Sequence, residues 1–183
     1  MKRDILIIPG FGENSTMGPY KKLKKLLESK PGITVRFYNP QWNYRTTTDW
    51  LIDFERKITI TDETSIIGFS MGAYLALLIA QSHLVDQLIL ASLSPFFKEN
   101  IPRLPSAAHR FFGKRKMADF KNYSIPKKIK ANQAIFLFGD KDMAMAIKQA
   151  QKLARQYQGN FHLIQNTPHD LTDTYIQVIV GIL

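Results

Sequence analysis

Short apolar runs and amphipathic segments alternate along most of this 183-residue chain. The runs are rich in Ile, Leu and Phe, as expected for strands that are covered on both faces, and the segments between them repeat apolar residues at helical spacing. This alternation predicts the α/β class, with a doubly wound parallel sheet between two layers of helices. The expected strands are 5–8, 33–38, 64–68, 87–91, 134–138 and 161–164, and the expected helices are about 17–28, 47–57, 71–82, 143–157 and 170–181.

One long segment, residues 94–132, interrupts the alternation. It contains several prolines and a cluster of aromatic residues, and a connection of this length in a compact domain is usually a functional excursion. We therefore expect one domain, 1–183, with a short helical cap or lid at about 94–132. Exposed phenylalanine clusters are rare in monomeric proteins, so this cap should line a substrate pocket. The expected lining residues are Phe96, Phe97, Phe111 and Phe112. The alternative is a packing helix with no contact to substrate.

The sequence Gly68-Phe69-Ser70-Met71-Gly72 lies where a buried apolar run gives way to a helical pattern. In a tight turn of this kind the central residue is strained, and the residues two positions away on either side come close to neighbouring backbone, so glycine fits best there. The hydroxyl of Ser70 is then presented at the start of a helix, above the sheet. This arrangement predicts a nucleophilic serine; the alternative is an ordinary glycine-rich turn.

A serine hydroxyl becomes a good nucleophile only with a base, a group that orients the base, and donors for an oxyanion. His169 follows the last predicted strand and is the expected base. The expected acid is Asp142, which follows the strand at 134–138, while Asp140 more readily caps the tight turn with its side chain. Asp142 as a helix N-cap remains the alternative. The other histidines are expected to be structural: His83, His109 and His162.

The oxyanion would need two backbone N–H groups. One is expected from Met71, the residue after the nucleophile, and the other from Phe11 in the glycine-containing loop at 9–14. Glycines on either side of Phe11 allow the backbone to point inward. Without Ser70 this loop would be read as a plain glycine turn.

Taken together, these motifs resemble those of the α/β-hydrolases, and the resemblance extends over residues 5–183. Its anchors are the segments 9–12, 68–72, 139–142 and 168–170. The resemblance implies Ser70 as nucleophile, Asp142 as acid, His169 as base, and oxyanion donors at the amides of Phe11 and Met71. Many members carry His-Gly where this chain has Pro9-Gly10.

The strand before the Phe11 loop is the first in this chain, whereas many α/β-hydrolases have two strands before it. We therefore expect a minimal α/β-hydrolase sheet of about six strands, ordered 2-1-3-4-5-6. This layout is similar to that of the short serine hydrolases resembling retinoblastoma-binding protein 9, and the segment 128–132 adds to that likeness.

The chain has a formal net charge of +10 and no cysteine. The basic residues cluster at 21–25, 110–116 and 127–130, and we interpret them mainly as a solvated surface without nucleic-acid binding. No apolar run approaches the length of about 18 residues that a membrane helix needs. The apolar stretch 5–8 is also shorter than the signal-peptide core of about 7–15 residues. We expect a cytoplasmic protein without a membrane partner.

The sequence therefore predicts a serine hydrolase, without metal or cofactor, that cleaves an ester, a thioester or a small amide through an acyl-enzyme. Its partner would be a small-molecule acyl substrate, and the basic residues at 110–116 extend this to acidic or carrier-bound substrates. Two other hypotheses remain open at this point. One is a catalytically silent binding protein on a hydrolase scaffold, and the other is a basic interaction module. The sequence gives no indication of the oligomeric state.

Overall fold

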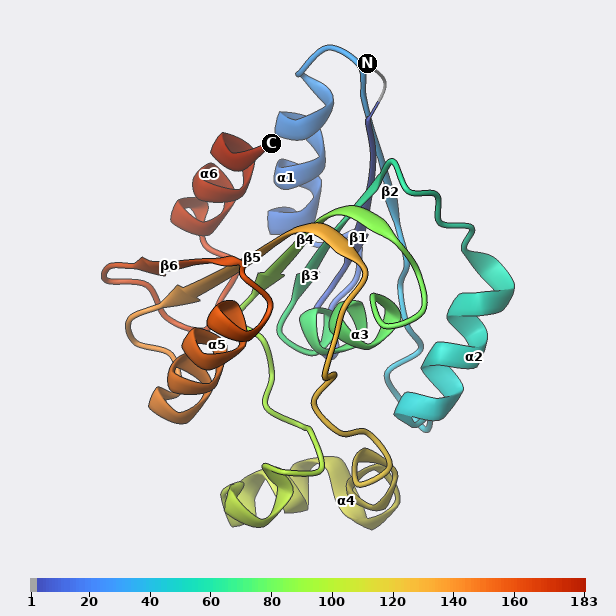
Figure 1. The fold of residues 1–183 in the computed structure, drawn as a ribbon, viewed down its shortest axis with the longest axis vertical. Coiled ribbons are helices and arrows are strands. Elements are labelled where there is room, and N and C mark those ends of the chain that lie inside the picture. Colours follow the sequence, from blue (N-terminus) through green and yellow to red (C-terminus); the bar gives the residue numbers. More distant parts are fainter. Residues whose placement is uncertain (1–2) are drawn as a thin grey trace.

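The computed structural model describes residues 3–183. It contains a six-stranded parallel sheet with the strand order β2-β1-β3-β4-β5-β6 (Figure 1). The strands are β1 (Arg3–Ile8), β2 (Ile33–Phe37), β3 (Thr64–Phe69), β4 (Val85–Ala91), β5 (Ala131–Gly139) and β6 (Asn160–Ile164). The predicted class, the six strands and their order are therefore confirmed.

Helices alternate with these strands. They are α1 (Gly18–Glu28), α2 (Thr47–Lys57), α3 (Met71–Ile79), α4 (Ser106–Phe120), α5 (Ala144–Gln156) and α6 (Asp173–Ile182), with one 3-10 turn, η1 (Ile101–Arg103). Every helix except α4 lies where the alternating pattern predicts one. Helix α6 begins later than expected because Thr172 caps it, its side chain accepting a hydrogen bond from the N–H of Tyr175. Residues 165–172 are therefore left as a loop, which carries His169.

Two hydrophobic cores lie on opposite faces of the sheet. Successive side chains of a strand point to opposite faces, so Ile5 and Ile7 enter one core and Leu6 and Ile8 enter the other. Helices α1 and α6 pack against each other over the first face, whereas α2, α3 and α5 cover the second. This two-sided burial explains why the central strands are apolar at almost every position.

Helix α3 is buried along its whole length, from Met71 to Ile79. A helix that is apolar all round needs cover on every side. The sheet and α2 supply part of this cover. The rest comes from the segment after β4, whose Phe97 and Phe120 pack against Tyr74 with ring centroids 4.9 and 5.9 Å apart.

The segment between β4 and β5 contains η1 and α4 and lies at the lower end of the molecule in Figure 1. Gly113, with φ of 73° and ψ of 167°, interrupts the helical conformation within α4. Met117 and Phe120 in the second half of α4 are buried in the core, whereas Phe111 in the first half is 69% exposed. The two halves of α4 therefore meet different surroundings.

Candidate active site

Ser70 lies in the sharp turn between β3 and α3. Its backbone has φ of 54° and ψ of −116°, a conformation that costs a non-glycine residue free energy. The backbone N–H of Ser70 donates to the carbonyl of Ala91 on β4 at 2.8 Å, which helps to hold the strained turn. A Cβ at Gly68 would overlap the backbone of Ala73, and one at Gly72 would overlap the carbonyl oxygen of Ile8. Both glycines of the motif are therefore sterically required.

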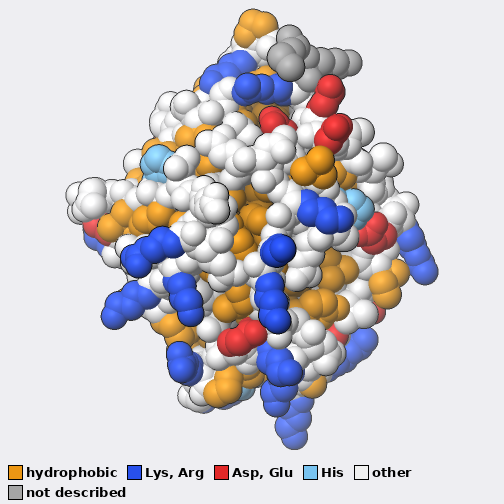
Figure 2. Space-filling view, in the orientation of Figure 1, with side chains coloured by type: hydrophobic (Ala, Val, Ile, Leu, Met, Phe, Trp, Pro, Cys, Tyr) orange, Lys and Arg blue, Asp and Glu red, His pale blue; other side chains and the backbone are white. Residues whose placement is uncertain are grey.

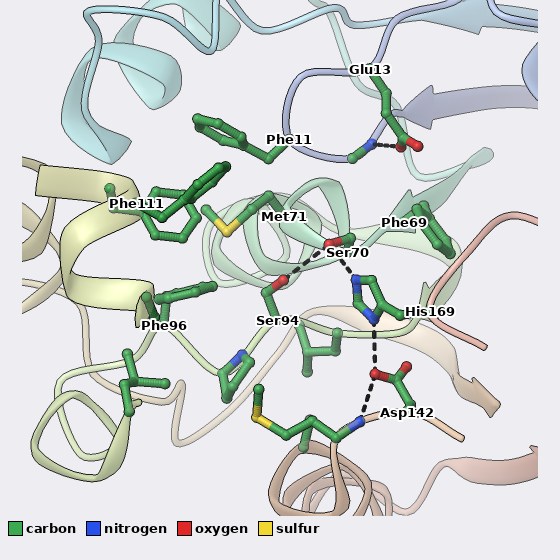
Figure 3. A pocket seen from close by; sticks show the side chains of 18 of the residues that line it. Phe11, Glu13, Phe69, Ser70, Met71, Ser94, Phe96, Phe111, Asp142 and His169 are labelled. Carbon is green, nitrogen blue, oxygen red and sulfur yellow. Dashed lines mark hydrogen bonds and ion pairs between the residues drawn. The ribbon is translucent and has the colours of Figure 1, made fainter. Parts of the chain in front are cut away.

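Three loops at one edge of the sheet bring Ser70, His169 and Asp142 together (Figure 3). The Oγ of Ser70 lies 2.9 Å from Nε2 of His169, and Nδ1 of His169 lies 2.8 Å from Oδ1 of Asp142. The loops follow β3, β5 and β6, so residues far apart in the chain form one continuous row of hydrogen bonds. Such a row lets the carboxylate orient the ring and lets the ring accept the serine proton.

The two neighbouring aspartates have separate environments. Asp142 is 4% exposed at its side chain, and its Oδ1 also accepts a hydrogen bond from the N–H of Met143 at 2.9 Å. Asp140 instead accepts a hydrogen bond from the N–H of Thr167 at 3.0 Å, which ties the two loops together. Asp140 therefore supports the loop that carries His169, whereas Asp142 contacts the imidazole itself.

Electrostatics shift the pKa values of the carboxylate and the imidazole in opposite directions. Burial raises the pKa of Asp142, but the hydrogen bond and charge of His169 outweigh it, and the net pKa lies below its ordinary value. Burial lowers the pKa of His169, but the hydrogen bond and charge of Asp142 outweigh burial, with smaller contributions from Asp170 and Glu13. The net pKa of His169 is therefore raised above 6.5.

The loop after β1 is held by hydrogen bonds to the acidic side chain of Glu13. The N–H of Gly10 donates to Oε2 of Glu13 at 2.9 Å and to the hydroxyl of Tyr20 at 3.0 Å, and that hydroxyl donates to Glu13 at 2.6 Å. Among residues 3–183, the amides of Phe11 and Met71 have no hydrogen-bond acceptor. Both residues line the cavity beside Ser70, so these two N–H groups remain available to a ligand (Figure 3).

A largely apolar cavity of about 440 Å³ opens beside Ser70. Phe96, Phe111 and Phe112 line it, as expected from the sequence. Their rings interlock, with centroids 4.6 Å apart for Phe96 and Phe112 and 4.9 Å apart for Phe111 and Phe112. Phe97 is not brought to the cavity: its side chain is fully buried and packs against Tyr74 instead.

Ser94 is a site residue that the sequence analysis missed. Its Oγ lies 3.2 Å from Oγ of Ser70, and its N–H donates to the carbonyl of Ser70 at 3.3 Å. The side chain is buried and lines the cavity (Figure 3). Its position three residues after the end of β4, at the start of the long excursion, is the sequence signal that could have indicated it.

The other histidines lie away from this cavity. His83 contacts Glu55 at 2.8 Å, and His109 and His162 are exposed. Within the described range 3–183, no group of three or more His, Asp or Glu side chains is arranged to hold a metal ion. In the same range no helix is both long and apolar enough to cross a membrane.

Comparisons with solved structures show that several proteins share this fold. Est1E from Butyrivibrio proteoclasticus is 15% identical, with a TM-score of 0.78, over 99% of this chain and 85% of that chain. The ydeN gene product from B. subtilis is 18% identical, with a TM-score of 0.69, over 99% of this chain and 96% of that chain. The RedJ thioesterase from Streptomyces coelicolor is 13% identical, with a TM-score of 0.65, over 98% of this chain and 88% of that chain.

The sequence matches none of the curated proteins. The likeness to solved structures, at these low identities, establishes the α/β-hydrolase fold. The family itself follows from the sequence, because the model of the family described as serine hydrolase matches residues 5–175, which include every candidate site residue. The chain is an enzyme of the serine hydrolase family.

Proposed function

We propose that this hydrolase cleaves an ester or thioester of a small apolar acyl group through an acyl-enzyme formed on Ser70. One observation carries the proposal: the hydrogen-bonded row of Ser70, His169 and Asp142 ends at an open, apolar cavity. An open cavity beside an intact row argues against a silent binding protein, which would need no such alignment.

In the acylation step, Ser70 Oγ attacks the carbonyl carbon of the substrate while His169 Nε2 accepts the hydroxyl proton. The carbonyl oxygen becomes an oxyanion, which the free amides of Phe11 and Met71 would stabilise. His169 then gives its proton to the departing alcohol or thiol, and the carbon–oxygen or carbon–sulfur bond breaks. Asp142 stabilises the imidazolium throughout and does not itself take a proton.

In the deacylation step, His169 removes a proton from water, and the resulting hydroxide attacks the acyl carbon. Ser70 Oγ is now the leaving group and takes back a proton from His169 as the acid departs. When Nδ1 of neutral His169 donates to Asp142, Nε2 accepts the hydrogen bond of the Ser70 hydroxyl, and in this tautomer the Ser94 hydroxyl is the donor in its contact with Ser70. Ser94 thus supplies a hydrogen bond to the oxygen that gains negative charge in this step.

The segment 94–132 acts in this proposal as a lid whose phenylalanines bind the acyl chain. Support comes from Phe96, Phe111 and Phe112, all of which line the cavity. The cavity volume of about 440 Å³ lies within the range of about 300–1,000 Å³ that is typical of small-molecule sites. The lid also carries Lys116, whose Nζ lies 5.8 Å from the ring centroid of Phe11 in the cavity wall, so acidic or carrier-bound substrates are included in the substrate class.

The structural neighbours are consistent with acyl substrates of both kinds. Est1E has been crystallised with ferulic acid bound, and RedJ is a thioesterase of the prodiginine biosynthetic pathway. Ester and thioester carbonyls are more electrophilic than amide carbonyls and have better leaving groups. A preference for them over amides is therefore the simplest expectation.

A serine-directed fluorophosphonate tests the proposal directly. We expect covalent labelling of Ser70, at a rate that rises with pH as His169 loses its proton. Because Asp142 raises the pKa of His169, the midpoint should lie above 6.5. Mass spectrometry of the peptide adduct and the labelling rate between about pH 5 and pH 9 provide the measurement. An adduct on another residue, or a rate that does not change with pH, would contradict the proposed roles.

The role of Ser94 predicts a specific kinetic defect. Ser94→Ala should lower the deacylation rate about 10- to 100-fold, because a hydrogen bond to a charged oxygen is lost. Acylation should change less, so a burst of leaving group followed by slow turnover is expected. Ser94→Thr keeps the hydroxyl and serves as the matched control. Equal slowing of acylation and deacylation in Ser94→Ala would show that Ser94 only orients the nucleophile.

A further inference from the structure

A second hollow lies beside the apolar cavity and shares Phe112 with it. It has a volume of about 500 Å³ and is formed where the loop before α2 faces the middle of α4. Its lining consists of Asn43, Tyr44, Arg45, Phe112, Gly113, Lys114, Arg115 and Lys116. Four of these eight residues are cationic, and none is acidic. The mixed polar and apolar lining is unlike that of the acyl cavity.

The positive charge of this hollow is only partly balanced by its surroundings. Arg115 lies 3.5 Å from Asp49, and its guanidinium also donates to the carbonyl of Tyr44 at 3.4 Å. In contrast, no carboxylate of residues 3–183 lies within ion-pair distance of Arg45, Lys114 or Lys116. Three cations without a carboxylate within ion-pair distance therefore surround the hollow, and Asp49 is close enough for its charge to interact with Arg45 as well as with Arg115. Figure 2 shows the wider setting, in which basic side chains outnumber acidic ones around α4.

Lys116 links this hollow to the catalytic cavity. Its Nζ lies 5.8 Å from the ring centroid of Phe11, and the ring of Phe11 lies 5.0 Å from that of Phe112. Phe112 lines both the hollow and the acyl cavity, and the amide of Phe11 is the expected oxyanion donor. Partial burial and the charge of Arg115 lower the pKa of Lys116, as expected for an ammonium held beside another cation. A ligand at the reacting carbonyl could thus extend past Phe11 into the hollow.

We infer that the hollow formed by Arg45, Lys114 and Lys116 binds a phosphate group on the leaving alcohol or thiol of the acyl substrate. This inference rests on the proposed function and narrows its substrate class to acyl esters or thioesters of a phosphorylated leaving group. A phosphate carries about 1.5 to 2 negative charges and several acceptor oxygens at neutral pH. A phosphate group therefore complements three neighbouring cations better than a single carboxylate would. An arginine can also bind a phosphate with two parallel hydrogen bonds.

The acyl chain and the phosphate would occupy separate parts of the enzyme. The apolar cavity lined by Phe96, Phe111 and Phe112 accepts the acyl group, and the reacting carbonyl lies at Ser70. The leaving group passes the Phe11 loop toward Lys116. A small phosphorylated thiol presents a phosphomonoester, and a phosphopantetheine arm attached to a carrier protein presents a phosphodiester of lower charge, so both offer anionic phosphate oxygens to the hollow.

The test uses two thioesters that differ in one phosphate. The butyryl thioesters of pantetheine and of 4′-phosphopantetheine would be compared with the full-length wild-type enzyme and with two variants. Arg45→Gln combined with Lys114→Gln removes two charges of the hollow, and Lys116→Met removes the third while keeping its apolar stem over Phe11. Lys127→Gln combined with Lys128→Gln is the matched control, because both lysines are exposed and line neither the hollow nor the acyl cavity.

In the two variants that remove charges of the hollow, here called the hollow variants, we expect kcat/KM for the phosphorylated thioester to fall about tenfold, mainly because KM rises. The unphosphorylated thioester and the control variant should change less than about twofold, and added salt should remove the advantage of the phosphate. The same butyryl group on a carrier protein distinguishes the two sources. A loss confined to the carrier-bound substrate would overturn the inference, because it would place the contact on the protein surface of the carrier.

The outcomes separate this inference from the function on which it rests. If wild type hydrolyses neither thioester nor an activated ester, the proposed function fails. If wild type hydrolyses both thioesters, the phosphate site alone is tested by the hollow variants. It is overturned if these variants lower kcat/KM equally for the two thioesters, or lower it for neither.

Discussion

Replacing Ser70 with alanine is expected to lower the hydrolysis of an activated ester by about 10³-fold or more. The substitution removes the one oxygen that can attack the acyl carbon, and His169 and Asp142 have no nucleophile to activate without it. Residual hydrolysis would come from water bound near the oxyanion donors. Steady-state turnover of a chromogenic ester, together with loss of fluorophosphonate labelling, measures the effect.

The comparison needs a serine that is far from the cavity. Ser29 caps the end of α1, where its hydroxyl donates to the carbonyl of Leu26, and it takes no part in the site. Ser29→Ala should keep wild-type turnover. Thermal unfolding of both variants checks that they are folded. Alanine is smaller than serine, so neither substitution introduces a clash. Turnover by Ser70→Ala within about tenfold of wild type would mean that another group forms the acyl-enzyme.

Most of the fold could be predicted because local and global signals agree in this chain. Strands such as β3 and β4 are apolar along nearly their whole length, which is the pattern of strands covered on both faces. Helices such as α1 instead carry apolar residues on one side, with lysines between them. The strand order came from the resemblance, because periodicity alone does not determine which strands are neighbours.

The three central site residues were also accessible to sequence reasoning, for a topological reason. Ser70, Asp142 and His169 each follow the end of a parallel strand, and such ends meet at one edge of the sheet. Sequence position after a strand therefore implies proximity in space. The same argument could not choose between Asp140 and Asp142, because both follow β5.

The details of the long excursion could not be predicted with the same success. Phe96 and Phe97 are adjacent, yet Phe96 lines the cavity while Phe97 is buried against α3. In an irregular segment no period of two or of 3.6 assigns side chains to faces. Ser94 was missed for the same reason, since its contact with Ser70 depends on how one loop passes over another. Such contacts are set by tertiary packing.

The choice between the two aspartates gives the second large expected effect. Asp142→Asn should lower turnover of an activated ester by about 10²- to 10⁴-fold, because the neutral amide no longer stabilises the imidazolium or fixes its tautomer. Asp140→Asn should cost less than about tenfold, because an asparagine oxygen can still accept the hydrogen bond from Thr167. The pair is well matched, since both substitutions remove one charge and change the side-chain shape very little.

The pH dependence of the residual activity distinguishes a role at the imidazole from a structural one. In wild type the charge and hydrogen bond of Asp142 raise the pKa of His169, so removing them should move the midpoint of the activity profile to lower pH. Asp140→Asn should leave the midpoint where it is, because Asp140 contacts the Thr167 backbone and not the ring. Equal losses in the two variants, or a midpoint that moves only in Asp140→Asn, would transfer the role of orienting acid from Asp142 to Asp140.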